Sequence, residues 1–340
     1  MYAVLAGGVG AARFLRGLTA VVVPEQVSAV VNVGDDLDRL GLRICPDLDS
    51  ITYWLAGVVH PEQQWGRADE RFTVSEELAR LGHEPWFTLG DRDLALHLHR
   101  TEQLRRGLPL SQVAAEVAHA FGVRVRLLPA TDDRVETRIT TVDGRDLHFQ
   151  EYWVRERAAP EVAGVRLAGA PTARPAPGVV DALLSADAVL IAPSNPVVSI
   201  DTILAVPGIA EALRQTVAPV VGVSPIVGGR VVRGMADRLL PAVGAEVSAV
   251  GVAAHYGPRL LDGWVVDHRD ADAVEAVTDT GIRCVATDTL MDDVEVAAAL
   301  ARTCLDLAAE VAPPPSATAP GGATTGGATT GGAAPGGADR

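Results

Sequence analysis

The sequence predicts an α/β fold of the Rossmann-like, three-layer kind, with a parallel sheet and an inserted, mainly helical lobe that carries a β-hairpin. Three observations predict it. Short apolar runs of strand type alternate with helical stretches at both ends of the chain. A glycine-rich turn joins the first strand to the first helix. Hydrophobic residues make up 48% of the 340 residues, enough for one large core or two modest ones.

The first β-α-β unit lies at the N-terminus. Tyr2–Ala6 is an apolar strand, Gly7–Gly10 is the turn, and Ala11–Leu18 opens a helix. A second strand, Val27–Val33, runs into the acidic segment Asn32–Asp36. Glycines between a strand and a helix let backbone N–H groups close on a phosphate at the helix N-terminus. The unit therefore predicts a nucleotide or diphosphate site.

Two familiar glycine motifs fit this turn poorly. A Walker A loop requires Lys, yet the chain contains no lysine and the nearest cation is Arg13. A dinucleotide fingerprint would begin at Gly8 and Gly10, with Asp35 or Asp36 for the ribose, but Arg13 occupies the third glycine position. A tight turn without any ligand is the remaining alternative.

Residues 50–175 do not continue the β-α rhythm, and we expect them to form an inserted lobe that covers the nucleotide site and receives a second substrate. Val135–Thr141 and Leu147–Val154 alternate apolar and polar residues around Asp143-Gly144, which predicts a hairpin. The predicted helices of the lobe are Ser50–Val59, Arg71–Leu81, Leu94–Arg100 and Ser111–Phe121, with Ser50 and Ser111 as N-caps.

The alternation resumes near residue 179, so 1–49 and 176–312 are predicted to form the nucleotide-binding core. Residues 313–340 are low in complexity, with Gly-Gly-Ala-Thr-Thr at 321–325 and again at 326–330, and predict a disordered tail without a catalytic part. The expected strands of the second half are Ala188–Ala192, Pro219–Val223, Ser248–Ala253, Trp264–Asp267 and Ile282–Val285. The expected helices are Val180–Leu184, Ile209–Gln215, Gly234–Leu240 and Asp292–Ala309.

Four loops each follow an apolar strand: Gly7–Gly10, Asn32–Asp36, Pro193–Pro196 and Ser224–Gly229. In an open parallel sheet, ligands bind outside the carboxyl ends of the strands. We therefore expect all four loops at one rim. The alternative is that Pro and Gly simply punctuate any α/β chain.

Clustered carboxylates without Cys or His favour a hard ion such as Mg²⁺. Asp35, Asp36, Asp47 and Asp49 form such a cluster, and we expect Asp47 and Asp49 to bind the metal. In an extended segment these two alternate residues would face the same way. Helix capping and solvated turns are the alternative roles.

The segment Gly90–Asp93 places Arg92 between two acids in an expected loop. Arg92 could clamp a phosphate or stabilise a leaving group, or it could form an ion pair within the loop. His97 and His99 alternate in an expected helix and are interpreted as surface or packing residues. Because no G-x-S-x-G or H-E-x-x-H motif is present, the sequence favours transfer by positioning and electrostatics.

Composition excludes several classes of function. The net charge of −14 argues against non-specific nucleic-acid binding. No apolar run approaches the ~20 residues that a membrane span requires, and Met1 leads straight into a strand without a basic leader. We expect a cytoplasmic protein with small-molecule substrates and with neither nucleic acid nor membrane as a partner.

Five motifs in order resemble the 2-phospho-L-lactate transferase family of coenzyme F420 biosynthesis, whose actinobacterial members are called phosphoenolpyruvate transferases. The likeness covers about residues 1–310. The motifs are Gly7–Arg13, Asn32–Asp36, Pro46–Ser50, Leu89–Asp93 and Pro193–Pro196. Gly10-Ala11 stands where many relatives have a second Gly-Gly pair.

The resemblance implies transfer of enolpyruvyl phosphate or 2-phospho-L-lactate from a guanosine diphosphate-linked donor to the deazaflavin Fo, with release of GMP. It also implies Mg²⁺ and a homodimer. The lysine-free composition suits an actinobacterium, and for an actinobacterial member the resemblance favours the enolpyruvyl donor. The implied catalytic residues are Asp49 and Arg92, the Fo residues Asp49, Asp91 and Arg92, and the metal ligands Asp47 and Asp49. The implied nucleotide residues are Gly8, Gly10, Asn32, Ser194 and Asn195.

Two other functions remain open. A distantly similar family shares the glycine turn and the Asn32–Asp36 segment, and its members look like sugar-nucleotide-binding regulators that catalyse nothing. Pro46–Ser50 and Leu89–Asp93 favour the transferase over that class. A dinucleotide-dependent oxidoreductase ranks third because of Arg13.

Overall fold

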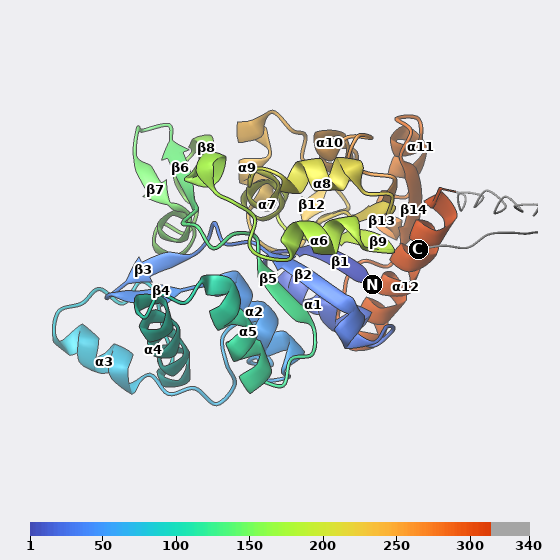
Figure 1. The fold of residues 1–340 in the computed structure, drawn as a ribbon. Helices are drawn as coiled ribbons and strands as arrows, with labels where there is room; N and C mark the ends of the chain where they lie inside the picture. The colour runs from blue at the N-terminus through green and yellow to red at the C-terminus, as the bar shows by residue number, and fades with distance from the viewer. Residues whose placement is uncertain (314–340) are drawn as a thin grey trace, which may run out of the picture.

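The computed structural model describes residues 1–313 and confirms the predicted α/β fold (Figure 1). Seven parallel strands form one sheet in the order β14-β13-β10-β9-β1-β2-β5. The predicted disordered tail lies, apart from its first residue, outside the described residues. The strands are β1 (Tyr2–Ala6), β2 (Val27–Val31), β5 (Arg126–Pro129), β9 (Ala188–Ile191), β10 (Val220–Val223), β13 (Gly263–Asp267) and β14 (Arg283–Thr287).

The strand order reverses direction next to β1. The chain moves outward from β1 through β2 to β5, and then returns to place β9 on the other side of β1. Loops after strands on the two sides of such a reversal diverge and leave a crevice at the carboxyl edge. The fold therefore places a crevice beside the glycine turn.

Helices cover both faces of the sheet, so its central strands are largely apolar and buried (Figure 1). All five residues of β2 are buried, as are four of the five in β1. One face carries α1 (Gly8–Leu18), α2 (Pro46–Leu55), α5 (Leu110–Ala120) and α12 (Val294–Val311). The other carries α6 (Val179–Leu184), α7 (Asp201–Leu204), α8 (Ile209–Gln215), α10 (Ala249–Tyr256) and α11 (Ala273–Thr278).

The remaining elements surround the carboxyl edge. A three-stranded antiparallel sheet contains the predicted hairpin, with one more strand than predicted. Its strands are β6 (Glu136–Thr141), β7 (Asp146–His148) and β8 (Val162–Ala168). Two short hairpins are β3 (Leu37–Arg39) with β4 (Leu42–Ile44), and β11 (Ile226–Val227) with β12 (Arg230–Val231). The outer helices are α3 (Thr73–Arg80), α4 (Asp91–Arg105) and α9 (Ala236–Leu239).

Residues 50–175 also contribute to the main sheet. Within them, β5 pairs with β2 in parallel and forms the edge strand, and α5 packs beside it. The predicted lobe is therefore not wholly separate from the sheet. Its hairpin and the helices α3 and α4 are the parts that extend beyond the sheet (Figure 1).

Four assignments made from the sequence were wrong. Ser248–Ala253 is not a strand but the start of α10, whose N-cap Ser248 accepts a hydrogen bond from the Gly251 N–H at 2.9 Å. A short apolar run fits a buried helix as well as a strand. Ser50 and Ser111 are not N-caps, because α2 begins at Pro46 and α5 at Leu110. The second hairpin strand ends at His148 and gives way to a helical turn, η2 (Glu151–Arg155).

Candidate active site

A cavity of about 620 Å³ opens at the carboxyl edge of the sheet. All four loops that were predicted to share one rim contribute to its wall, which confirms that prediction. Segments after β1, β2, β9, β10 and β14 all reach it. The lining includes Gly8, Gly10, Arg13, Asp35, Asp47, Asp49, Tyr53, Asp93, His97, Ser194, Asn195, Ser224, Arg233 and Thr289.

The two glycines of the turn have different physical roles. Gly8 has a φ of +70° and open space where a Cβ would be, so its backbone faces the cavity without obstruction. A Cβ on Gly10 would lie 2.4 Å from the Pro193 carbonyl oxygen. Gly10 therefore lets α1 approach the loop after β9, and this contact holds two walls of the site together.

We expect Gly10→Ala to lower the free energy of unfolding by about 2–3 kcal/mol, because helix and loop must separate to admit the methyl group. Urea denaturation of the full chain measures this change. Gly8→Asn is the matched control, since Asn tolerates the left-handed region and the space is open; it should cost under about 1 kcal/mol. Equal stability of the two variants would contradict the close-approach role.

Two buried carboxylates meet at the amide of Asn32. The Asn32 Nδ2 atom donates to Asp35 Oδ1 at 3.1 Å and to Asp47 Oδ2 at 2.9 Å. Neither carboxylate forms an ion pair within residues 1–313. Burial raises the pKa of Asp47 to about 6, opposed by hydrogen bonds from Asn32 and the Gly8 N–H. Burial, followed by the neighbouring Asp47 charge, also raises the pKa of Asp35.

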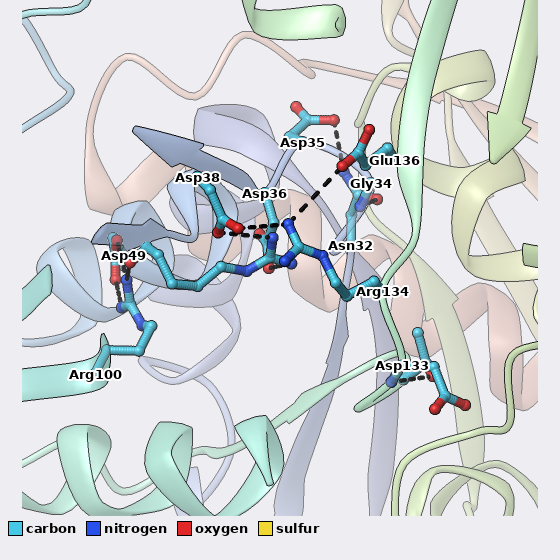
Figure 2. A network of polar contacts seen from close by, with 12 residues as sticks. Asn32, Gly34, Asp35, Asp36, Asp38, Asp49, Arg100, Asp133, Arg134 and Glu136 are labelled. Carbon is cyan, nitrogen blue, oxygen red and sulfur yellow. Dashed lines mark hydrogen bonds and ion pairs between the residues drawn. The ribbon is translucent and has the colours of Figure 1, made fainter. Parts of the chain in front are cut away.

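A third carboxylate, Asp49, is fully engaged by a buried arginine. Arg100 of α4 donates from Nη1 to Asp49 Oδ2 at 3.1 Å and from Nη2 to Asp49 Oδ1 (Figure 2). His97, one turn earlier on α4, places Nδ1 3.3 Å from Arg100 Nη1. Burial, partly offset by Asp49, lowers the pKa of His97 to about 4, so the ring is neutral at pH 7. The result is a compensated ion pair with a neutral imidazole beside it.

The acidic start of α4 contributes one residue to the cavity. Asp93 lines it and accepts a hydrogen bond from the Tyr53 hydroxyl at 2.7 Å. Burial raises the pKa of Asp93 to about 6, against the Tyr53 hydrogen bond, which lowers it. Glu70 accepts from the Arg92 and Asp93 backbone N–H groups at 2.9 and 3.0 Å, which fixes this helix end. Asp93 is thus a positioned carboxylate that can exchange its proton near neutral pH.

Aromatic side chains form another part of the wall. Three of the chain's five tryptophans, Trp65, Trp86 and Trp153, line the cavity together with Phe87 and Phe149. Trp65 is 49% exposed although it is large and apolar. Aromatic faces at a cavity favour planar ligands, because stacking buries area on both partners. The site thus combines acidic, cationic and aromatic parts.

A family model described as 2-phospho-L-lactate transferase CofD matches residues 3–304 of this chain. The chain belongs to this family. Proteins named phosphoenolpyruvate transferase are similar to it along nearly their whole length. The relative from Kitasatospora aureofaciens is 54% identical over 90% of this chain and 97% of its own. The relative from Mycolicibacterium smegmatis is 46% identical over 90% of this chain and 98% of its own.

A solved structure shares the fold. A UPF0052 family member from Bacillus halodurans superposes with a TM-score of 0.59 at 18% identity, covering 89% of this chain and 98% of that one. This likeness supports the three-layer α/β architecture. Within residues 1–313 no single helix is long and apolar enough to cross a membrane, although the bent pair Pro196–Leu204 and Ile209–Gln215 passes by length and composition together.

The CofD-family motifs contribute to the cavity unequally. Gly8, Gly10, Ser194 and Asn195 line it, as predicted for the nucleotide side, whereas Asn32 lies fully buried behind Asp35 and Asp47. Ser194 Oγ accepts from the Gly7 N–H at 3.2 Å. Asn195 Oδ1 caps the next helical turn by accepting from two backbone N–H groups at 3.0 and 3.3 Å. Their predicted nucleotide contacts remain a prediction.

Asp91 and Arg92 do not line the cavity in this structure. Asp91 accepts from the Val74 N–H at 3.1 Å, and Arg92 is exposed with Nη1 3.3 Å from the Ala68 carbonyl oxygen. The expected loop is the first turn of α4, which points successive side chains in different directions. Asp93 is the member of the motif that faces the site. The roles predicted for Asp91 and Arg92 stay predictions.

Asp47 and Asp49 are not in an extended segment either. Both lie in the first turn of α2, where carboxylates also favour the positive end of the helix dipole. Within residues 1–313 no three His, Cys, Asp or Glu side chains are grouped to hold a metal ion. Mg²⁺ commonly takes only one or two protein carboxylates plus water and phosphate oxygens. Asp35 and Asp47 fit that pattern better than Asp49, which Arg100 already neutralises.

Sequence reasoning missed Arg100, His97, Tyr53 and Asp93. His97 was interpreted as a surface or packing residue, yet it is buried and lines the cavity. The spacing of His97 and Arg100, three apart on one helix, was the available signal that they share a face. Their partner Asp49 lies 51 positions before Arg100, so only the tertiary fold brings them together.

Proposed function

We propose that this chain transfers a phospho-three-carbon-acid group from a guanosine diphosphate-linked donor to the terminal hydroxyl of the deazaflavin Fo. The products are GMP and coenzyme F420-0, or its dehydro form if the group is enolpyruvyl phosphate. Membership of the CofD family carries the proposal. The names of the relatives at 46–54% identity favour the enolpyruvyl donor. We further propose that the protein acts as a cytoplasmic homodimer.

The reaction balances without a covalent enzyme intermediate. The acceptor oxygen forms a bond to the donor's β-phosphorus, the bond from that phosphorus to the bridging oxygen breaks, and GMP leaves with the bridging oxygen. The acceptor hydroxyl loses one proton. Asp93 suits the role of the base that accepts this proton, because it lies in the cavity, is held by Tyr53, and has a pKa of about 6. Phosphoryl transfer of this kind depends mainly on positioning and charge stabilisation.

Two parts of the cavity suit the two proposed substrates. The Gly8 backbone and the loop of Ser194 and Asn195 suit the donor's phosphates at the N-terminus of α1. The tryptophan-rich wall suits a planar deazaflavin. The predicted Fo residue Asp49 lies in the wall between α2 and α4, with Arg100 fixing its orientation. Catalysis would then follow from holding both substrates in line.

Mg²⁺ is part of this proposal. Asp47, with Asp35 beside it through Asn32, would hold the ion at the donor's phosphates. When bound, Mg²⁺ would neutralise charge on the diphosphate as it develops on the leaving group. Within residues 1–313 the hydrogen-bond donors to Asp35 and Asp47 are all neutral, which supports a cation as the missing partner of these two buried carboxylates.

The test is chromatography of Fo incubated with the purified full chain, Mg²⁺ and each guanylylated donor, with fluorescence detection. We expect a more acidic deazaflavin and an equal amount of GMP, faster with the enolpyruvyl donor than with the lactyl donor. A sample with EDTA should form no product. If Fo remains unchanged with every donor while a sugar nucleotide binds tightly by calorimetry, the transferase proposal fails.

A further inference from the structure

Two arginines in the cavity wall have no assigned role. Arg13 comes from the second turn of α1, and Arg233 from the segment after β12. Neither forms an ion pair within residues 1–313. In a chain with a net charge of −14, two cations facing a cavity without a carboxylate partner need an explanation.

Arg13 is held in place but left incompletely bonded. Its guanidinium carbon lies over the Trp54 ring, 5.6 Å from the centroid, and this cation–π contact helps to hold the side chain. Its Nε atom is buried and has no hydrogen-bond partner in the described structure. Burial and then the positive charge of Arg233 lower the pKa of Arg13, while Asp292 opposes them. Arg13 therefore has an unmet donor and a repulsive cationic neighbour.

Arg233 is positioned by hydrogen bonds to Gln63 and Gln64 rather than by an ion pair. Its Nη2 donates to the Gln63 carbonyl oxygen at 3.0 Å and its Nη1 to Gln64 Oε1 at 3.2 Å. A guanidinium has five N–H donors, so these two bonds leave others free. The Gln64 carbonyl in turn accepts from Trp54 Nε1 at 3.1 Å. Both arginines are thus tied to Trp54, Arg13 directly and Arg233 through Gln64.

Both signs of charge line the cavity. Its carboxylates are Asp35, Asp47, Asp49, Asp93 and Asp292, and its cations are Arg13 and Arg233. The first turn of α1 adds the positive end of a helix dipole and contains no acidic residue. Two guanidiniums near a helix N-terminus match an oxyanion, because their forked donors can bind phosphate or carboxylate in bidentate fashion.

We propose that Arg13 and Arg233 form an oxyanion subsite that binds a phosphate or carboxylate group of the donor. Binding of an anion would satisfy the free donors and remove the repulsion between the two cations. The identity of the anion rests on the proposed function, but the subsite itself does not. Arg13 and Arg233 would then belong to the donor side of the cavity. Its other parts, the glycine turn and the loop after β9, offer backbone groups and neutral side chains.

The test is calorimetric titration of the purified full chain with three probes: inorganic pyrophosphate, GDP and phosphoenolpyruvate. We expect Arg13→Met and Arg233→Met to weaken binding about 10- to 100-fold for at least one probe. Arg16→Met and Arg230→Met are the matched controls. Arg16 lies over the same Trp54 ring at 5.8 Å, but neither Arg16 nor Arg230 lines the cavity. Both controls should bind every probe within twofold of the unmodified chain.

The pattern of loss identifies the anion. Weaker binding of pyrophosphate and GDP would place the donor's diphosphate on the pair, and weaker binding of phosphoenolpyruvate alone would place the three-carbon acid there. Either pattern supports the subsite. Unchanged binding in both cavity variants, or no binding of any probe by the unmodified chain, would overturn it. A chain that binds these anions but transfers nothing to Fo would retain the subsite and lose only the proposed function.

Discussion

Replacement of Arg100 by Met is expected to lower the free energy of unfolding by about 3–5 kcal/mol. The side chains of Arg100 and Asp49 are only 3% and 8% exposed, so the change would leave a buried carboxylate without its charge partner. His97 Nδ1 lies 3.7 Å from Asp49 Oδ2, but burial, the largest influence on the pKa of His97, lowers it and opposes its taking over the charge of Arg100. Urea denaturation followed by circular dichroism measures the loss.

Three further variants separate the ion pair from packing. Arg100→Lys keeps the charge but not the bidentate contact. Its free energy of unfolding should lie between those of Arg100→Met and the unmodified chain. Arg100→Met combined with Asp49→Leu removes both charges and should recover most of the stability. Arg105→Met, on the exposed part of the same helix, should change it by less than about 0.5 kcal/mol. A loss below about 1 kcal/mol for Arg100→Met would show that Asp49 does not need its partner.

The same variants distinguish a positioning role from a purely structural one. Arg100 contacts Asp49 and not the cavity, since it is absent from the lining. If it orients Asp49, Arg100→Lys should lower kcat while leaving the KM for the donor within about threefold. A merely structural role would change thermal stability without lowering kcat selectively relative to the KM for the donor. The kinetic comparison is made well below the melting temperature of each variant.

The central sheet could be predicted from the sequence because its signals are local. Buried parallel strands are near-continuous apolar runs, and β1, β2, β9, β10 and β13 each have one. The rim followed from topology, since loops after parallel strands must emerge on one edge. The strand β5 was missed because Arg126–Pro129 is short, begins with an exposed Arg and ends with Pro.

The chemistry of the site could be predicted only in part. The clustering of carboxylates in the sequence points to Asp47 but not to its helical setting. Ser50 is a plausible N-cap, yet Pro46 at the first helical position is an equally good signal, and the helix begins there. Partnerships such as Asp49 with Arg100 depend on contacts between distant segments. Nothing local in α4 indicates that Arg100 is buried, because its neighbours are mostly polar.

Replacement of Asp47 by Asn is expected to lower the transfer rate at least about a hundredfold and, at the same time, to stabilise the metal-free fold at pH 8. The first effect follows from loss of a carboxylate at the proposed Mg²⁺ position, where a metal contributes several kcal/mol to the barrier. The second follows from burial, because burying the charged Asp47 carboxylate costs desolvation free energy that a neutral amide does not cost.

The pH dependence has a definite sign. The folded chain binds the Asp47 proton more tightly than the unfolded chain, with a pKa of about 6 against an ordinary value of 3.8. The Asp47 contribution therefore lowers the stability of the metal-free protein as the pH rises from about 4 through 6, in the same direction as the contributions of Asp35 and Asp93, and Asp47→Asn should make the total fall smaller. Melting temperatures between pH 4.5 and 8, in EDTA, measure it. Asp279→Asn, at an exposed aspartate directly after α11, is the control, and its melting temperatures should change with pH as those of the unmodified chain do.

Added Mg²⁺ distinguishes a metal-binding carboxylate from one that is only buried. At pH 8, millimolar Mg²⁺ should raise the melting temperature of the unmodified chain, because a ligand that binds only the folded state stabilises it. The same addition should not stabilise Asp47→Asn. If both proteins respond equally, Asp47 is not a ligand and Asn32 holds the two carboxylates for another reason. If Asp47→Asn melts at a lower temperature than the unmodified chain in EDTA, the hydrogen bonds to Asp47 outweigh the cost of burying its charge.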